Sequence, residues 1–189
     1  MKKISTLFAK DPKNLARVID KINTENAWVI SGEAIATRKF DGTSVAIING
    51  ELFKRFDAKK GRAIPANAIP CQEADLITGH HPHWIKCDRT KSEDKFFFEG
   101  FDSLDTKTDG TFELCGPKVQ GNPEKLEKHT LIKHGSEVLD FVSLGFEDLE
   151  KFLSENDIEG IVFHHISDGR MCKLRKSDFG IKRLELEAV

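Results

Sequence analysis

The sequence predicts an α+β fold in which antiparallel β-sheets carry flanking helices. Two strand–turn–strand patterns support this class: strand-like segments flank Asn49-Gly50, and a second pair flanks Asp168-Gly169. A dipeptide of this kind between two such segments is a strong local signal for a β-hairpin. Apolar residues at helical spacing are confined to a few segments, so strands are expected to dominate the fold.

The N-terminal part of the chain is expected to contain a helix and then an extended segment. Asp11-Pro12 combines a good N-cap residue with a proline suited to the first helical position, and apolar residues at helical spacing continue to about Asn23. The segment from Trp28 to Thr37 is apolar and expected to be extended. Residues 44–48 and 51–56 then form the first predicted hairpin.

The middle of the chain is expected to hold a long loop and two further strands. Residues 58–94 contain repeated Gly and Pro, which is typical of a functional loop. Within it, the segment His80–Cys87 has no assigned role. A plain surface loop is the favoured interpretation, a loop over the substrate with Trp84 available for stacking on a base is an alternative, and its spacing argues against a zinc site. Three consecutive Phe residues favour a strand from Lys95 to Phe101. Asp109-Gly110 predicts a turn into another strand, which ends at Cys115.

The C-terminal third is expected to form a helix and the second hairpin. Phe146, Leu149, Phe152 and Leu153 have the spacing of an amphipathic helix. Residues 160–166 and 170–176 would pair across Asp168-Gly169. Lys173 and Arg175 are separated by one residue on the second strand, so their side chains would project to the same face.

Length and composition fit one globular domain spanning residues 1–189. The formal net charge of -2 excludes a globally basic protein, so any nucleic-acid contact must come from a local patch. With no signal peptide or long apolar run, a cytoplasmic location and no membrane partner are expected. The four cysteines fit no zinc template and are expected to be buried or idle thiols. They are Cys71, Cys87, Cys115 and Cys172.

Lys39-Phe40-Asp41-Gly42 is the most informative motif. By itself, a surface lysine beside a turn explains it better. A lysine that takes AMP from ATP needs a deprotonated amine, basic residues for the phosphates, a carboxylate for a metal and hydrogen-bond partners for the ribose. The chain offers these residue types in order after Lys39. They are Arg55, Glu113, Glu159, Lys173 and Arg175.

These blocks resemble the motifs of the lysine-dependent nucleotidyltransferase superfamily, which comprises DNA ligases, RNA ligases and capping enzymes. The longer strings are similar to the compact, single-domain ATP-dependent 5′-3′ RNA ligases. The similarity extends from about Ile4 to Gly180. The strings that carry it are residues 36–43, 54–61, 113–123 and 159–164.

The resemblance implies a role for each matching residue. Lys39, Glu159 and Lys173 would be catalytic: Lys39 would form lysyl-AMP, and Glu159 would orient that lysine or hold the metal. Glu113 would bind a ribose hydroxyl. The implied cofactors are ATP and Mg²⁺ (or Mn²⁺). The implied nucleotide-binding residues are Thr37, Arg38, Asp41, Gly42, Arg55, Glu113, Lys173 and Arg175.

The implied reaction joins an RNA 5′-phosphate to a 3′-hydroxyl in three steps. A local basic cluster would help to bind the RNA backbone. No OB domain is expected after Gly180, which argues against a capping enzyme. A DNA or nick-sealing ligase and a catalytically silent RNA-end-binding module remain as alternatives, and a monomer is favoured. The basic cluster comprises Lys54, Arg55, Lys59, Lys60 and Arg62.

Overall fold

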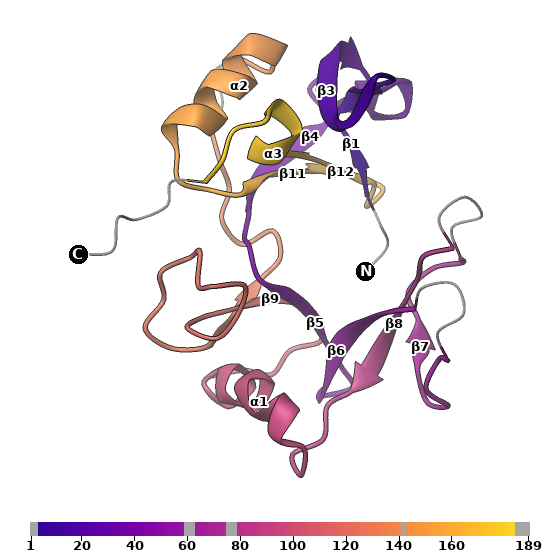
Figure 1. The fold of residues 1–189 in the computed structure, drawn as a ribbon, viewed down its shortest axis with the longest axis vertical. Coiled ribbons are helices and arrows are strands. Elements are labelled where there is room, and N and C mark those ends of the chain that lie inside the picture. The colour runs from indigo at the N-terminus through magenta and orange to yellow at the C-terminus, as the bar shows by residue number, and fades with distance from the viewer. Residues whose placement is uncertain (1–3, 59–62, 75–78, 141–142, 184–189) are drawn as a thin grey trace. The chain divides into compact units, whose positions relative to one another are not determined.

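The computed structural model describes residues 4–58, 63–74, 79–140 and 143–183. The chain divides into two compact units, which are treated separately below. The terminal unit comprises Ile4–Phe40 and Gly135–Val189, and the central unit contains Asp41–His134. Both combine mainly antiparallel strands with a few helices, so the expected α+β class is confirmed (Figure 1). The single domain over residues 1–189 stays a prediction.

The terminal unit is built on a four-stranded sheet with the order β1-β12-β11-β4. The central strand β11 is antiparallel to both of its neighbours, and β1 pairs with β12 in parallel. The strands are β1 (Ser5–Thr6), β4 (Ala34–Lys39), β11 (Gly160–His165) and β12 (Met171–Arg175). A hairpin of β2 (Phe8–Asp11) and β3 (Asn14–Ile22), a 3₁₀ helix η1 (Thr24–Val29), α2 (Phe146–Glu155) and α3 (Lys176–Phe179) complete the unit.

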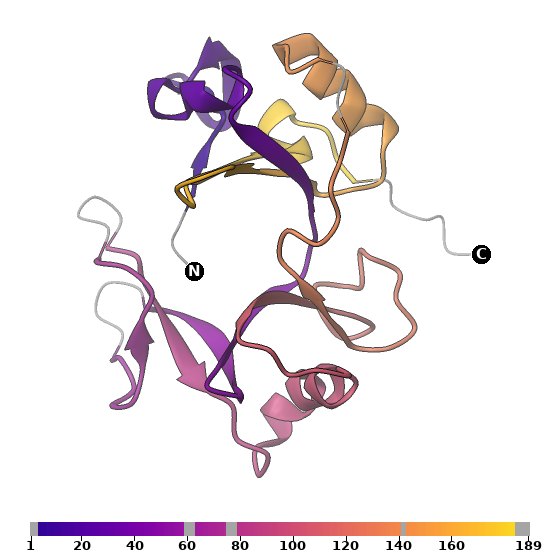
Figure 2. The ribbon, with the colours of Figure 1, turned by 180° about the vertical axis from the view of Figure 1, so that it is seen from behind.

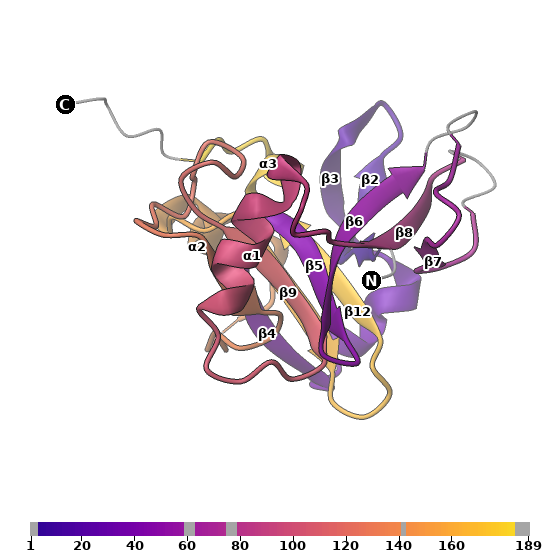
Figure 3. The ribbon, with the colours of Figure 1, turned by 90° about the horizontal axis from the view of Figure 1, so that it is seen from below.

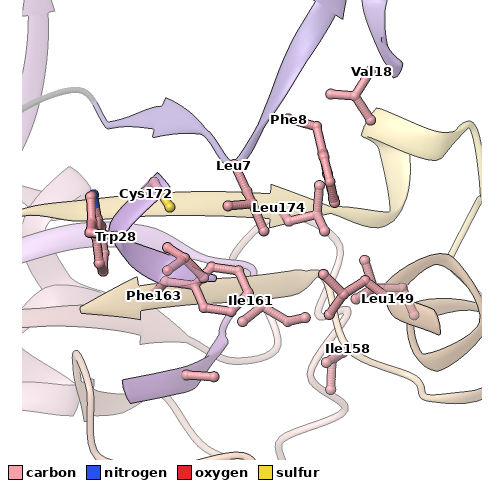
Figure 4. Close-up of a cluster of buried hydrophobic side chains, with 13 residues drawn as sticks. Leu7, Phe8, Val18, Trp28, Leu149, Ile158, Ile161, Phe163, Cys172 and Leu174 are labelled. Atoms are coloured by element: carbon pink, nitrogen blue, oxygen red, sulfur yellow. The ribbon is translucent and has the colours of Figure 1, made fainter. Parts of the chain in front are cut away.

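One face of this sheet forms the core of the terminal unit. Ile161 and Phe163 of β11 and Leu174 of β12 are fully buried and pack with Leu149 of α2 (Figure 4). The helices α2 and α3 lie on the same side of the sheet in both views (Figures 1 and 2). Because side chains alternate along a strand, the residues between these apolar positions project from the opposite face.

The central unit is built on a six-stranded sheet with the order β10-β9-β5-β6-β8-β7. Helix α1 (Lys95–Asp102) packs Phe97, Phe98 and Phe101 against one face of it, over β5 and β9 (Figure 3). A 3₁₀ turn, η2 (Ser92–Asp94), precedes the helix. The strands are β5 (Thr43–Ile48), β6 (Glu51–Ala58), β7 (Ile69–Pro70), β8 (His81–Lys86), β9 (Gly110–Cys115) and β10 (Thr130–Lys133).

The predicted hairpins are confirmed. Asn49 and Gly50 both have positive φ angles, 52° and 74°, which is the conformation that a two-residue turn of this type requires. Gly169 takes φ 74° in the turn between β11 and β12. The predicted helix that contains Phe146 and Leu153 and the strand after Asp109 are also present.

The helix predicted after Asp11-Pro12 is wrong, because this region is a hairpin. The Asp11 carboxylate accepts a hydrogen bond from the Lys13 amide at 2.8 Å, so the Asp-Pro pair closes a turn. Val18 and Ile22 contribute to the core from β3, and their separation of four residues suits a strand as well as a helix. Leu15 lies near the start of β3 and is 73% exposed. The expected extended segment from Trp28 to Thr37 is extended only from Ala34 onward.

Two expectations for the central unit are also wrong. Lys95–Asp102 is a helix, because the spacing of Phe97, Phe98 and Phe101 gives one apolar helical face, whereas Phe96 stacks on His129. The expected loop contains the strand β8, which pairs with β6 along its length. Trp84 in β8 is only 6% exposed and packs against Phe53, so it is not available to stack on a base.

The four cysteines are free thiols, and all except Cys71 are buried. Burial raises the pKa of Cys87 and of Cys172 to about 12, so neither is a thiolate near neutral pH. Because the thiolate is the reactive form, these two residues behave as small apolar side chains.

Gly160 is required by the close approach of β11 and β12, and its substitution tests the sheet. A Cβ atom at Gly160 would lie 2.3 Å from the backbone oxygen of Leu174. We expect Gly160→Ala to lower the free energy of unfolding by about 3 kcal/mol, because a backbone atom cannot move aside as a side chain does. Urea unfolding followed by circular dichroism measures this loss.

The matched control is Gly169→Ala in the turn of the same hairpin. Its Cβ would meet no atom within 4 Å, and only its φ of 74° opposes a side chain. We expect a smaller loss, about 1 kcal/mol. Equal losses for the two variants would contradict the close approach at Gly160.

Candidate active site

The face of the terminal sheet opposite the core carries four of the predicted site residues. Lys39 and Arg175 both pair with Gly160, and Thr37 and Lys173 both pair with Val162. Cross-strand partners share a face, so all four side chains project from the same side of the sheet. Lys39 and Arg175 are two strands apart, roughly 10 Å, and the intervening Gly160 has no side chain.

Glu159 is the direct partner of Lys39. It immediately precedes β11, and its carboxylate accepts a hydrogen bond from the Lys39 ammonium in a short ion pair. Its backbone carbonyl accepts a hydrogen bond from the Lys176 amide at 3.0 Å, which fixes the residue at the start of the strand. The structure therefore brings together two predicted catalytic residues that are 120 positions apart in the sequence.

Lys173 is a half-buried cation among other cations. Its pKa is lowered to about 8, first by burial and then by the positive charges of Arg175 and Lys39. The carboxylates of Asp178 and Glu159 offset only part of this effect. Positive charges held together at this cost are typical of a site that binds an anion.

Asp178 holds Arg175 in place. This carboxylate is fully buried and accepts hydrogen bonds from the Arg175 backbone amide at 2.9 Å and from its Nη2 at 3.0 Å. Lys10 donates a further hydrogen bond at 2.6 Å. Burial raises the pKa of Asp178, but the hydrogen bonds from Arg175 and Lys10 outweigh it and hold the pKa below its ordinary value. The carboxylate is therefore ionised at neutral pH.

Thr37 and Arg38 face in opposite directions from β4. The buried Thr37 hydroxyl donates to the Val162 carbonyl at 3.2 Å and lies 3.0 Å from His164 Nε2. Arg38 instead pairs with Glu137 and lies over the Phe40 ring, 4.7 Å from its centroid. The structure thus places Thr37, and not Arg38, on the face that carries Lys39.

In the central unit, Asp41 and Gly42 form a tightly held connection that leads into β5. The Asp41 amide donates to the Glu124 carboxylate at 2.9 Å. A Cβ atom at Gly42 would lie 2.2 Å from the Leu114 backbone oxygen, so only glycine fits there. The connection that follows Lys39 in the sequence is therefore fixed by β9 and by the segment that contains Glu124.

Glu113 and Arg55 share the face of the central sheet that does not carry α1. Glu113 of β9 pairs with Ser44 of β5, so these two side chains share a face. The adjacent residue pair, Val45 of β5 and Lys54 of β6, faces α1. Because side chains alternate along each strand, Ser44 and Arg55 project from the opposite face. Glu113 is buried, and its carboxylate accepts a hydrogen bond from His134 at 2.9 Å. The Ser44 hydroxyl is buried and has no hydrogen-bond partner within the residues that the structure describes.

The predicted basic cluster is divided by the alternation of β6. Arg55 pairs with Asp57 at 3.0 Å, whereas Lys54 lies on the α1 face and pairs with Asp94 at 2.5 Å. Burial lowers the pKa of Lys54, but its hydrogen bonds to Asp94 and Glu93 outweigh this and raise it overall. Lys59, Lys60 and Arg62 lie outside the described residues.

Sequence reasoning assigned no role to several side chains that contact the predicted site residues. Each acts through a contact between segments far apart in the chain, and no local sequence signal marks such a contact. The alternation of side chains along the second strand of the hairpin was the one sequence signal that correctly predicted an arrangement in the site, the shared face of Lys173 and Arg175. The missed residues are Lys10, Glu124, His134 and Asp178.

Comparison with known proteins identifies the family. None of the helices in the described part of the chain is long and apolar enough to cross a membrane. A search among curated proteins gave no match. The model of the RNA ligase 1 family matches residues 88–188, more than half of the chain, a range that contains Glu113, Glu159, Lys173 and Arg175. The chain therefore belongs to the RNA ligase 1 family.

Proposed function

We propose that this protein is an ATP-dependent RNA ligase that joins an RNA 5′-phosphate to a 3′-hydroxyl through AMP linked to Lys39. The observation that carries the proposal is the composition of one sheet face. There, a lysine bonded to a carboxylate, Glu159, shares the surface with Lys173 and Arg175. This arrangement supplies a nucleophile, a proton acceptor and cations for phosphate.

In the first step, the Lys39 amine attacks the α-phosphorus of ATP. A nitrogen–phosphorus bond forms, the bond from the α-phosphorus to the bridging oxygen breaks, and pyrophosphate leaves with the electron pair. The amine must lose its proton before attack, and the Glu159 carboxylate is in hydrogen-bond contact with it. Glu159 therefore both orients Lys39 and accepts its proton.

The leaving pyrophosphate gains negative charge, which the cations on the same face neutralise. Arg175 is held by Asp178 in one orientation and offers a fixed donor array. Lys173 adds a second positive charge near the centre of the sheet. Mg²⁺ would be held here by Glu159 together with phosphate and water oxygens, and when bound it would neutralise phosphate charge.

We propose that residues of the central unit bind the ribose of ATP. Glu113 is a buried hydrogen-bond acceptor on the sheet face that also carries Arg55 and the Ser44 hydroxyl. A ribose hydroxyl would donate to Glu113, and Ser44 would complete its own hydrogen bonding with the nucleotide. A buried polar group without a protein partner is favourable only when a ligand or water satisfies it.

In the second step, an oxygen of the RNA 5′-phosphate attacks the phosphorus of lysyl-AMP, and the nitrogen–phosphorus bond breaks. Lys39 then recovers its proton. In the third step, the RNA 3′-hydroxyl attacks the activated 5′-phosphate, loses its proton and displaces AMP. The net reaction consumes ATP and yields the joined RNA, AMP and pyrophosphate.

A covalent label on Lys39 is the direct test of this mechanism. We expect wild-type protein incubated with α-labelled ATP and Mg²⁺ to retain label after denaturation and to lose it in acid, because a phosphoramide is acid-labile. Lys39→Ala should show no label, whereas Lys13→Ala, which changes an exposed lysine of the β2–β3 turn, should label normally. An unlabelled wild-type protein would exclude the lysyl-AMP mechanism.

Matched RNA and DNA substrates separate RNA ligation from nick sealing in DNA. We expect single-stranded or nicked RNA ends to be joined at least tenfold faster than DNA ends of the same sequence. Gel analysis of 5′-labelled oligonucleotides measures both rates. Equal rates would favour the alternative of a general polynucleotide ligase, and label transfer without any joining would favour an RNA-end-binding module.

The pH dependence of nucleotide binding tests Lys173. Its pKa of about 8 means that the side chain is protonated below this pH and neutral above it. We therefore expect an ATP analogue without a cleavable α–β bond to bind several-fold more weakly at pH 9 than at pH 7. In Lys173→Arg the charge persists across this range, so the loss should be smaller. An unchanged pH dependence in Lys173→Arg would exclude phosphate binding by this residue.

A further inference from the structure

The fully buried Asp178 carboxylate binds two cations, and only one of them belongs to the predicted site. Its Oδ1 accepts hydrogen bonds from Arg175 Nη2 at 3.0 Å and from Lys10 Nζ at 2.6 Å. Two donors on one oxygen atom lie within about 6 Å of each other. Lys10 therefore places a second positive charge directly beside the Arg175 guanidinium.

Neither cation is saturated by Asp178. An ammonium group carries three N–H donors and a guanidinium carries five, so both groups have further donors to offer. The Lys10 side chain remains 30% exposed and that of Arg175 34% exposed, while Asp178 is closed to solvent. One carboxylate thus orients two partly exposed cations whose combined charge exceeds its own.

Lys10 reaches this position from the N-terminal hairpin. It lies in β2, outside the residues that match the RNA ligase 1 model, whereas Arg175 and Asp178 lie inside them. Arg175 of β12 already neutralises the Asp178 carboxylate through hydrogen bonds from its backbone amide and side chain, so Lys10 adds a positive charge beyond the one that this carboxylate requires. The additional charge is what a doubly charged anion requires.

We propose that Lys10 is a phosphate-binding residue that forms, together with Arg175 and around Asp178, a two-cation site for a phosphate group of the substrate. The inference rests on the proposed function, because it assigns this phosphate to the ligation reaction. The phosphate belongs either to the polyphosphate of ATP or to the 5′ end of the RNA. Both sources present the same dianionic oxygen array to Lys10 and Arg175.

Binding measurements test the site without requiring any reaction. The probes are inorganic tripolyphosphate and a short 5′-phosphorylated RNA, the latter compared with its 5′-hydroxyl twin. Titration calorimetry at low salt should show about tenfold weaker binding of at least one probe to Lys10→Ala, the effect of losing one charge-assisted hydrogen bond. For the RNA, the 5′-hydroxyl twin should bind wild type and variant equally.

Lys13→Ala is the matched control, since Lys13 carries the same charge in the same hairpin but is exposed. It should bind both probes as wild type does. Lys10→Arg should retain binding, which separates loss of charge from loss of folding if Lys10→Ala is unstable. The proposal is overturned if Lys10→Ala, with an intact circular dichroism spectrum, binds both probes as tightly as Lys13→Ala.

Single-turnover assays identify the source of the phosphate. If Lys10 binds the ATP polyphosphate, Lys10→Ala slows formation of lysyl-AMP and not its transfer to RNA. If Lys10 binds the RNA 5′-phosphate, transfer from pre-adenylylated protein slows instead. Either result supports the site, and unaffected rates in both steps count against it. A wild-type protein that binds the probes through Lys10 but takes no label would overturn the proposed reaction alone.

Discussion

The registered pairing of β11 with β4 and β12 is the constraint on which the candidate site depends. Alternation sends Ile161, Phe163 and Leu174 into the apolar core, so the intervening positions must project from the other face. A shift of one residue in register would bury Lys173 in that core and expose Leu174. The apolar core thus fixes the positions of the charged side chains, and Gly160 permits the close approach of the two strands at the level of Lys39.

The positive charges on this face are stabilised because two neighbouring carboxylates offset part of them. Glu159 pairs with Lys39, and Asp178 pairs with both Arg175 and Lys10. Burial, and then the positive charges of Arg175 and Lys39, lower the pKa of Lys173, which means that its protonated form is disfavoured on this face. An incoming phosphate would relieve this repulsion. A chain with a net charge of -2 therefore carries a local positive field on this face.

The sequence predicted the hairpins at Asn49-Gly50 and Asp168-Gly169 well and several other segments poorly, for identifiable reasons. Turns such as Asn49-Gly50 depend on backbone conformations that few residues adopt, so the signal is local. The segments 14–22 and 95–102 were assigned to the wrong class because short apolar spacings fit both helix and strand. The strand β8 was missed because its polar sequence is stabilised by pairing with β6, which composition does not reveal.

The same distinction separates the site residues that were predictable from those that were not. Lys173 and Arg175 share a strand, so their common face follows from period two alone. Asp178 lies close by in the sequence, yet its importance comes from joining Arg175 to Lys10, 168 residues away. Similarly, Glu124 and His134 matter because folding brings them to Asp41 and Glu113. In this chain the predicted site residues carry sequence signals, whereas the groups that hold them in position are revealed only by tertiary contacts.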